Sequence, residues 1–196
     1  MIEVSRYHPL LVALHWLLAM LIVAALALGA LVMAKLPNSD PAKLEALRSH
    51  MAGGALILGL TLARLIVRIR TMHPARASTS SFFLNMVAWA SHRMLYVLIF
   101  TMAASGISMA LQAGLVDVVY GGHGALPPDL WVYPVRSLHY LISRMLMALI
   151  ALHIAGALYH AVILRDGLLR RMAFGRRLRA ARNLAFPALN RPISKA

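Results

Sequence analysis

The sequence predicts an all-α membrane protein built as a four-helix transmembrane bundle. Of its 196 residues, 61% are hydrophobic and only 13% are charged, whereas soluble domains are about 45–50% apolar and about 25% charged. The apolar residues gather in four long stretches, and a chain of this length suits one compact unit of a few helices. These observations together favour four membrane spans.

Each predicted span follows from length and composition. A spanning helix needs roughly 20 mostly apolar residues, and four stretches meet this requirement: residues 10 to about 33, 50 to about 67, 84 to about 111, and 138 to about 164. The first stretch is too long for the apolar region of a signal peptide, and AKLPNSDPAKLE follows it rather than a clear cleavage site. We therefore expect it to remain as a span.

Basic residues set the expected orientation. Lys and Arg total 20 against 6 Asp and Glu, a formal net charge of +14. They concentrate between the second and third spans and after the fourth, as expected of cytoplasmic segments. Both termini are therefore predicted cytoplasmic, with residues 1–175 as the membrane domain and 176–196 as a basic cytoplasmic tail. Because the charge lies beside the spans, we expect no nucleic-acid partner.

The chain contains no cysteine. Disulfides, thiolate metal ligands, cysteine nucleophiles and covalent haem attachment through C-x-x-C-H are all excluded.

Histidines enter the apolar stretches at regular intervals. An ionisable residue within a span usually faces the bundle interior and is a functional hypothesis, although a single one is often only a hydrogen-bonded interior residue. In the fourth span, His139 and His153 are fourteen residues apart, which is close to four turns and about 21 Å. His160 lies about 10 Å further along the same face. One stripe of this helix therefore offers imidazoles at three depths.

The other spans supply partners at matching depths. His50 and His139 open their predicted helices at the same end of the bundle. His15 lies in the opposite half, where either His153 or His160 has a comparable depth. Two facing imidazoles on different helices are suited to the axial ligation of a b haem. Zinc or copper needs more clustered donors, and no Asp, Glu or Cys lies within a predicted span.

At these residues the chain resembles the bacterial cytochrome b561 family. It resembles more distantly the cytochrome b subunits of membrane hydrogenases and formate dehydrogenases. The matching segments are LHWLLA around His15, SHMAGGALIL around His50 with the following RLIVRIR, and the ordered set His139, His153 and His160 followed by LLRRM. The likeness extends over residues 5 to about 175.

The resemblance implies a four-helix bundle in a bacterial inner membrane, with two b haems stacked across it. Carried over to this chain, His15 with His153 would ligate the haem iron on the cytoplasmic side. His50 with His139 would ligate the haem iron on the periplasmic side. His160 would then be free, near a quinone pocket in the cytoplasmic half. The loop segment GGHGALPPD matches no family pattern, which leaves the periplasmic electron partner open.

The expected function is electron transfer between the periplasmic side and quinone. Two axial histidines leave no open iron position, so electrons must pass at the haem edge. The family includes superoxide oxidases, which implies a quinone-linked oxidoreductase that takes electrons from superoxide and reduces ubiquinone. The alternative is a haem-bearing anchor subunit that relays electrons between a partner dehydrogenase or periplasmic cytochrome and quinone. A haem-free structural protein or transporter is a third class, but the broken helices and repeats of transporters are not visible.

Basic side chains near the predicted haems are further candidates. A cationic rim on the periplasmic side is expected from Lys35, Lys43, Arg48, Arg136 and Arg144. Arg48 and Arg136 are close in sequence to two of the histidines, so we expect them to contact haem propionates. His92, beside Arg93 at the start of the third span, either lines the quinone site with His160 or simply anchors its helix.

Overall fold

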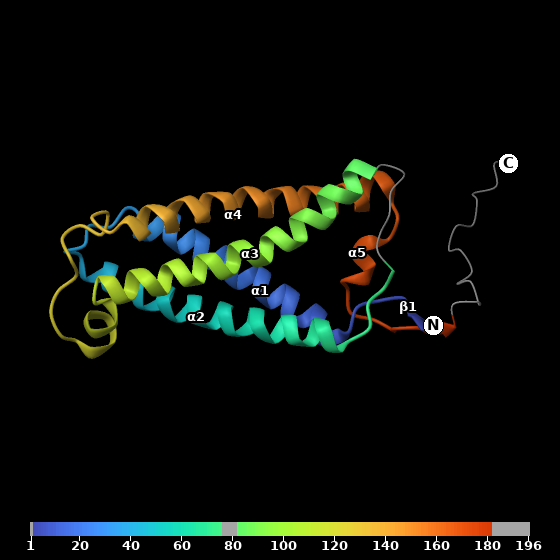
Figure 1. Cartoon of the computed structure of the whole chain (residues 1–196), viewed down its shortest axis with the longest axis horizontal. Coiled ribbons are helices and arrows are strands. Elements are labelled where there is room, and N and C mark those ends of the chain that lie inside the picture. Colours follow the sequence, from blue (N-terminus) through green and yellow to red (C-terminus); the bar gives the residue numbers. More distant parts are fainter. Residues whose placement is uncertain (1, 76–81, 182–196) are drawn as a thin grey trace.

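Four long helices run side by side along the length of the molecule (Figure 1). The computed structural model describes residues 2–75 and 82–181. The four are α1 with its π-helical continuation η1, then α2, α3, and α4 with its π-helical continuation η3. Their bounds are Pro9–Ala27 and Leu28–Met33, Pro41–Arg70, Phe82–Gln112, and Pro134–Leu158 and Tyr159–Leu164. All four are long and apolar enough to cross a membrane, which confirms the predicted fold class.

The bundle packs as two pairs of helices. α1 packs on α2 and α3 packs on α4, while α2 and α3 join the pairs. The buried centre draws on all four helices, with Leu18, Ile57, Leu98 and Leu146 among its members. Many large apolar side chains of the described residues are exposed, as expected of helices surrounded by lipid.

Two helices begin earlier than the sequence predicts. α2 starts at Pro41 rather than near residue 50, because the Asp40 carboxylate accepts a hydrogen bond from the Ala42 backbone N–H at 2.8 Å and proline suits the first helical position. α4 starts at Pro134 rather than near residue 138. The prediction that His50 and His139 open their helices was therefore wrong, because both lie at least one turn inside.

The connection between α3 and α4 closes one end of the bundle. It contains a short π-helical turn, η2 (Asp117–Gly121), in which Val119 is 0% exposed. The Arg48 guanidinium donates two hydrogen bonds to the Val119 carbonyl, at 3.2 and 2.8 Å. The Tyr120 hydroxyl donates to the Arg48 carbonyl at 3.2 Å. This segment is therefore an ordered cap on the end of the bundle.

The two ends of the described chain meet at the opposite end of the bundle (Figure 1). Strand β1 (Ile2–Val4) pairs antiparallel with strand β2 (Arg179–Ala181). A short helix, α5 (Leu168–Arg171), precedes β2, and the Trp16 indole N–H donates to the Met172 carbonyl at 2.9 Å. Residues 176–181 of the predicted basic tail are thus held against the bundle, and residues 182–196 lie outside the described part of the chain.

Candidate functional site

One pair of imidazoles lies near the capped end of the bundle. The rings of His50 on α2 and His139 on α4 have centroids 6.2 Å apart and planes 75° apart. A glycine lies against each ring. A Cβ at Gly29 would be 3.7 Å from His50 Cε1, and a Cβ at Gly106 would be 3.4 Å from His139 Cε1. A methyl group would make ordinary van der Waals contact at Gly29 and a tighter contact at Gly106, so the backbone of η1 approaches the His50 ring closely and that of α3 approaches the His139 ring closely.

Hydrogen bonds fix the orientation of His139. Its Nδ1 is 2.9 Å from the Ser105 hydroxyl oxygen, and that hydroxyl donates to the Met102 carbonyl at 2.9 Å. Since the serine proton is used on the carbonyl, Nδ1 carries a proton and donates to Ser105, which leaves the lone pair of Nε2 free. His50 differs, because its buried Nδ1 has no hydrogen-bond partner among the described residues.

A second pair lies towards the end where the termini meet. The rings of His15 on α1 and His153 on α4 have centroids 6.3 Å apart and planes 74° apart. Spacing alone left His153 and His160 as equal candidates for the partner of His15, and the structure brings His15 to His153. Arg64 on α2 also reaches this group, with Nη2 3.5 Å from His15 Nδ1 and Nη1 donating to the Tyr96 hydroxyl at 2.5 Å.

The role of Arg64 was missed in the sequence, where it counted only as a topology signal. Arginine has donors but no acceptor, so the Nδ1 of His15 accepts in this long contact. A neutral His15 then carries its proton on Nε2. Binding a metal through Nε2 therefore requires Arg64 to release the ring, and a carboxylate-bearing ligand nearby would draw the guanidinium away.

His92 lies beside the second pair. Its ring centroid is 5.1 Å from that of His153, with the planes at 88°. His92 Nδ1 is 2.6 Å from the Ala88 carbonyl of its own helix, α3, so this nitrogen is the donor. The next residue, Arg93, has its guanidinium 3.8 Å from the centre of the Trp89 ring, which anchors this end of α3.

His160 has a carboxylate partner that the sequence did not suggest. Its Nδ1 is 2.5 Å from Asp166 Oδ2. Left-handed backbone at Arg165 (φ 50°) and Gly167 (φ 71°) folds the chain back after η3 so that Asp166 meets the imidazole. An Asp-Gly dipeptide is a turn signal that could have located this reversal, but its position beside His160 depends on where the helix ends.

The basic residues expected to form a rim have different environments. Lys43 is 8% exposed, with its ammonium on the carbonyls of Met33 and Leu36, so it caps the end of η1 rather than facing water. Arg48 binds Val119 and also pairs with Glu45 at 2.8 Å. Arg136 stacks 4.4 Å above the centre of the Trp131 ring.

Arg136 is close enough to interact electrostatically with both His50 and His139. Among the described residues it has no carboxylate partner. Each imidazole pair therefore has one arginine beside it, Arg136 at one end and Arg64 at the other, with positive charge available for an acidic ligand group.

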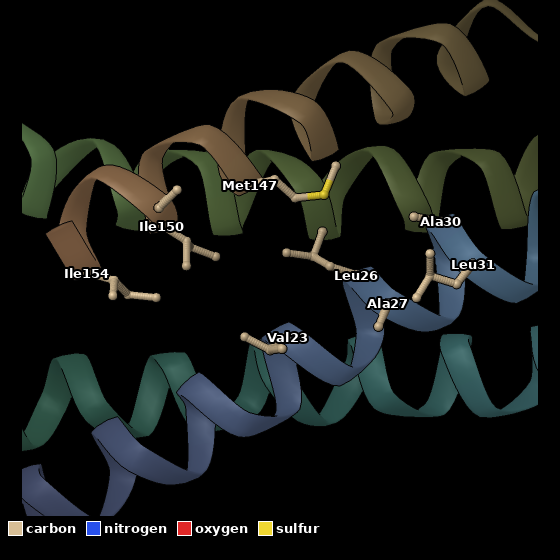
Figure 2. Close-up of a pocket in the computed structure, with 9 residues that line it drawn as sticks. Val23, Leu26, Ala27, Ala30, Leu31, Met147, Ile150 and Ile154 are labelled. Carbon is tan, nitrogen blue, oxygen red and sulfur yellow. The ribbon is translucent and has the colours of Figure 1, made fainter.

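An apolar cleft of about 350 Å³ separates α1 from α4 between the two imidazole pairs. Figure 2 shows its two walls, with Val23 and Leu26 on α1 facing Met147 and Ile150 on α4. The volume lies within the range of small-molecule sites, about 300–1,000 Å³. The cleft has no charged lining residue.

The paired imidazoles fit a haem better than a bare metal ion. A bond from a histidine nitrogen to a metal such as zinc is about 2 Å long, so a metal between two imidazoles sets the ring centres about 6 Å apart. Both pairs have this separation. No group of three or more His, Cys, Asp or Glu among the described residues could hold a metal ion by itself.

A four-span bundle with facing imidazoles, glycines beside the rings and an apolar cleft defines a class of protein, the helical membrane haem proteins. The comparisons narrow this class. The family model for prokaryotic cytochrome b561 matches residues 6–175, and the chain belongs to this family. It is therefore a multi-pass bacterial membrane protein that binds haem b and takes part in electron transfer.

Two relatives cover nearly the same extent. The chain is 25% identical over 171 residues to a protein of Yersinia pestis named probable superoxide oxidase CybB, covering 86% of this chain and 96% of the relative. It is 28% identical over 173 residues to cytochrome b561 homolog 2 of Escherichia coli (strain K12), covering 86% of this chain and 91% of the relative.

Proposed function

We propose that this chain is a di-haem b cytochrome of the bacterial inner membrane that carries electrons between the periplasmic face and the quinone pool. His15 and His153 hold the haem on the cytoplasmic side, and His50 and His139 hold the haem on the periplasmic side. The observation that carries the proposal is the equal separation of the two imidazole pairs, 6.3 and 6.2 Å. Both termini are cytoplasmic, and residues 176–196 form a basic tail after the haem domain.

Each haem, when bound, supplies an iron that gains and loses one electron and has no open position for dioxygen. The chain's own residues hold and orient it. Ser105 accepts from Nδ1 of His139 and so directs Nε2 towards the iron. Arg136 and Arg64 are suited to bind propionates because neither has a carboxylate partner among the described residues. Arg48 stays a prediction in this role, since its donors already serve Val119 and Glu45.

Ubiquinone is the proposed electron acceptor, at the cytoplasmic end near His160 and His92. Superoxide is the proposed donor, and the balanced reaction converts two superoxide anions, one quinone and two protons into two dioxygen molecules and one quinol. Exposed Arg144 and Arg48 would attract the anion at the periplasmic face. This makes the protein an enzyme, a superoxide:ubiquinone oxidoreductase. The relative named probable superoxide oxidase supports this proposal, because the match covers 96% of that relative's length.

A haem count tests the proposal directly. The purified protein should show the reduced-minus-oxidised spectrum of a low-spin b haem, with about two haems per chain by pyridine haemochrome. His15→Ala and His50→Ala should each remove about one haem, because each variant deletes one axial ligand of a different pair. Turnover of superoxide and ubiquinone by the isolated chain then separates a stand-alone enzyme from an anchor subunit.

A histidine outside the pairs provides the control. His123→Ala removes an imidazole that lies in the connection between α3 and α4, so it should keep both haems. Full haem content in His15→Ala or His50→Ala would exclude the proposed ligand sets. A chain without haem after expression with ample haem would remove the redox function altogether.

A further inference from the structure

The pairing of His160 with Asp166 is not explained by haem ligation. His160 lies seven residues beyond His153 at the end of α4, in η3, and its side chain is 16% exposed. Asp166 is 36% exposed and lies just beyond the last apolar helix. The carboxylate binds His160 through Oδ2 and accepts the Leu168 backbone N–H through Oδ1 at 3.0 Å. Because both oxygens are held, the imidazole has a fixed partner that water can also reach.

The electrostatic surroundings keep Asp166 ionised. Burial raises the pKa of this carboxyl, but the hydrogen bonds from His160 and the Leu168 backbone together with the positive charge of Arg171 lower it overall. Arg171 belongs to α5. The guanidinium of Arg165 turns away towards the Val162 carbonyl, and the Tyr159 ring meets the imidazole edge-on with centroids 6.2 Å apart. The imidazole therefore faces one anionic group.

Within the described part of the chain, His160 is the sole histidine with a carboxylate partner. His92 gives its Nδ1 proton to a backbone carbonyl, and His73 meets the Tyr7 ring. An imidazole hydrogen-bonded at Nδ1 to a carboxylate exchanges protons at Nε2, and this arrangement orients a general acid or base. His160 is thus the residue best built for proton transfer at this end of the bundle.

We infer that Asp166 is a positioning residue that holds His160 as the proton donor for quinone reduction at the cytoplasmic face. The inference rests on the proposed function. One quinone takes one electron from each of the two haems and two protons, so both carbonyl oxygens become hydroxyls. The protons pass from cytoplasmic water through Nε2 of His160 to the quinone. Asp166 keeps its charge throughout and favours reprotonation of the ring between the two transfers.

Stopped-flow reoxidation of the pre-reduced holoprotein by ubiquinone-1 tests this without superoxide. Asp166→Asn is nearly isosteric and should slow haem reoxidation about tenfold or more at saturating quinone, because an oriented acid contributes at least this much. The slowing should grow with pH, since protons become scarce. The quinone concentration for half-maximal rate should change little, and the haem count should stay the same.

Asp129→Asn is the matched control. Asp129 accepts a hydrogen bond from the Trp131 backbone N–H at 2.8 Å, as Asp166 does from the Leu168 backbone N–H. Unlike Asp166, Asp129 has no imidazole partner among the described residues. Its rate and pH profile should equal those of the wild type. Asp166→Glu should restore part of the lost rate. Adding Asp166→Asn to His160→Gln should slow the reaction no further, because the carboxylate acts through the imidazole.

The outcomes distinguish a failure of the proposed quinone reaction from a failure of the role proposed for Asp166. If quinone fails to reoxidise the wild type, both the quinone reaction and this inference are overturned. If the wild type reacts but Asp166→Asn has the rate and pH profile of the wild type, only the inference is overturned. The same holds if adding Asp166→Asn slows a His160→Gln protein further. If Asp166→Asn loses haem, reoxidation of the wild-type protein is measured instead. A solvent deuterium isotope effect on its rate supports the inference. A rate independent of both deuterium and pH refutes the inference.

Discussion

Ser105 is a small residue on which the geometry of a large cofactor site depends. Its hydroxyl lies between the Met102 carbonyl and Nδ1 of His139, so it selects one tautomer of the ring. A hydrogen bond at Nδ1 gives the imidazole more anionic character and makes it a stronger ligand. Stronger donation would favour ferric iron and lower the reduction potential of the haem that His139 is proposed to hold.

Ser105→Ala should therefore raise the midpoint potential of one haem and leave the other unchanged. Spectroelectrochemical titration of the purified protein resolves the two. Thr101→Ala is the control, because Thr101 also donates its hydroxyl to a carbonyl of α3, that of Val97 at 2.8 Å, but has no imidazole contact. Equal potentials in the wild type and Ser105→Ala would show that this hydrogen bond does not tune the site.

The sequence identified the histidines but not the residues that orient them. Imidazoles are rare in apolar helices, and the fourteen-residue interval in α4 made His139 and His153 stand out. Ser105 and Arg64 carry no such signal, because a serine or an arginine in a span has ordinary packing and topology explanations. Asp166 reaches His160 only through a reversal of the backbone. These partners lie on other helices or beyond a turn, and the spacing of residues within one helix does not predict such contacts.

The starts of the helices show how polar capping residues extend an element beyond its apolar stretch. Hydropathy located the lipid-spanning part of α2 but not its first turns, where Lys43, Glu45 and Arg48 lie outside the apolar run. Asp40 and Pro41 mark the true beginning. His50 therefore lies about 13.5 Å along its helix, by about 1.5 Å per residue, and its ring is beside Gly29.

Asp40→Ala removes the side-chain acceptor at the start of α2. Such a substitution costs about 1 kcal/mol of stability, so the thermal unfolding temperature of the detergent-solubilised holoprotein should fall. Ser39→Ala, at the neighbouring exposed position, should leave it unchanged. An equal unfolding temperature in Asp40→Ala would mean that the rest of α2 fixes its start without this cap.

The π-helical ends of α1 and α4 are elements that periodicity did not predict. Wider turns often occur at functional sites, and here η1 carries Gly29 and η3 carries His160. A π-turn rotates the following side chains relative to a regular helix. His160 is the second residue of η3, and its imidazole meets Asp166 beyond the end of that helix rather than His15.

At the level of the whole molecule, each imidazole pair joins α4 to a helix other than α3, its main packing partner. α1 packs on α2 and α3 on α4, whereas α1 and α4 face each other across the cleft of Figure 2. A ligand held by His15 and His153 would join these two helices. Binding only to the folded state stabilises it, so haem should hold the two halves of the bundle together.

The absence of cysteine from the whole sequence makes the orientation easy to measure. A single cysteine at Gly122, in the capped end, should react with a membrane-impermeant maleimide in spheroplasts. One at Ala75, beyond α2, should react only after the membrane is permeabilised, because basic residues favour the cytoplasm there. The reverse pattern would invert the proposed orientation while leaving the fold intact.

The pairing of β1 with β2 has a consequence for biosynthesis. Ile2 pairs with Ala181, so residues that leave the ribosome early must wait for a partner made after all four spans. Closing so long a loop costs entropy that only late contacts repay. The small sheet therefore forms last, once α4 has been inserted, and completes the end of the bundle where His160 and Asp166 meet.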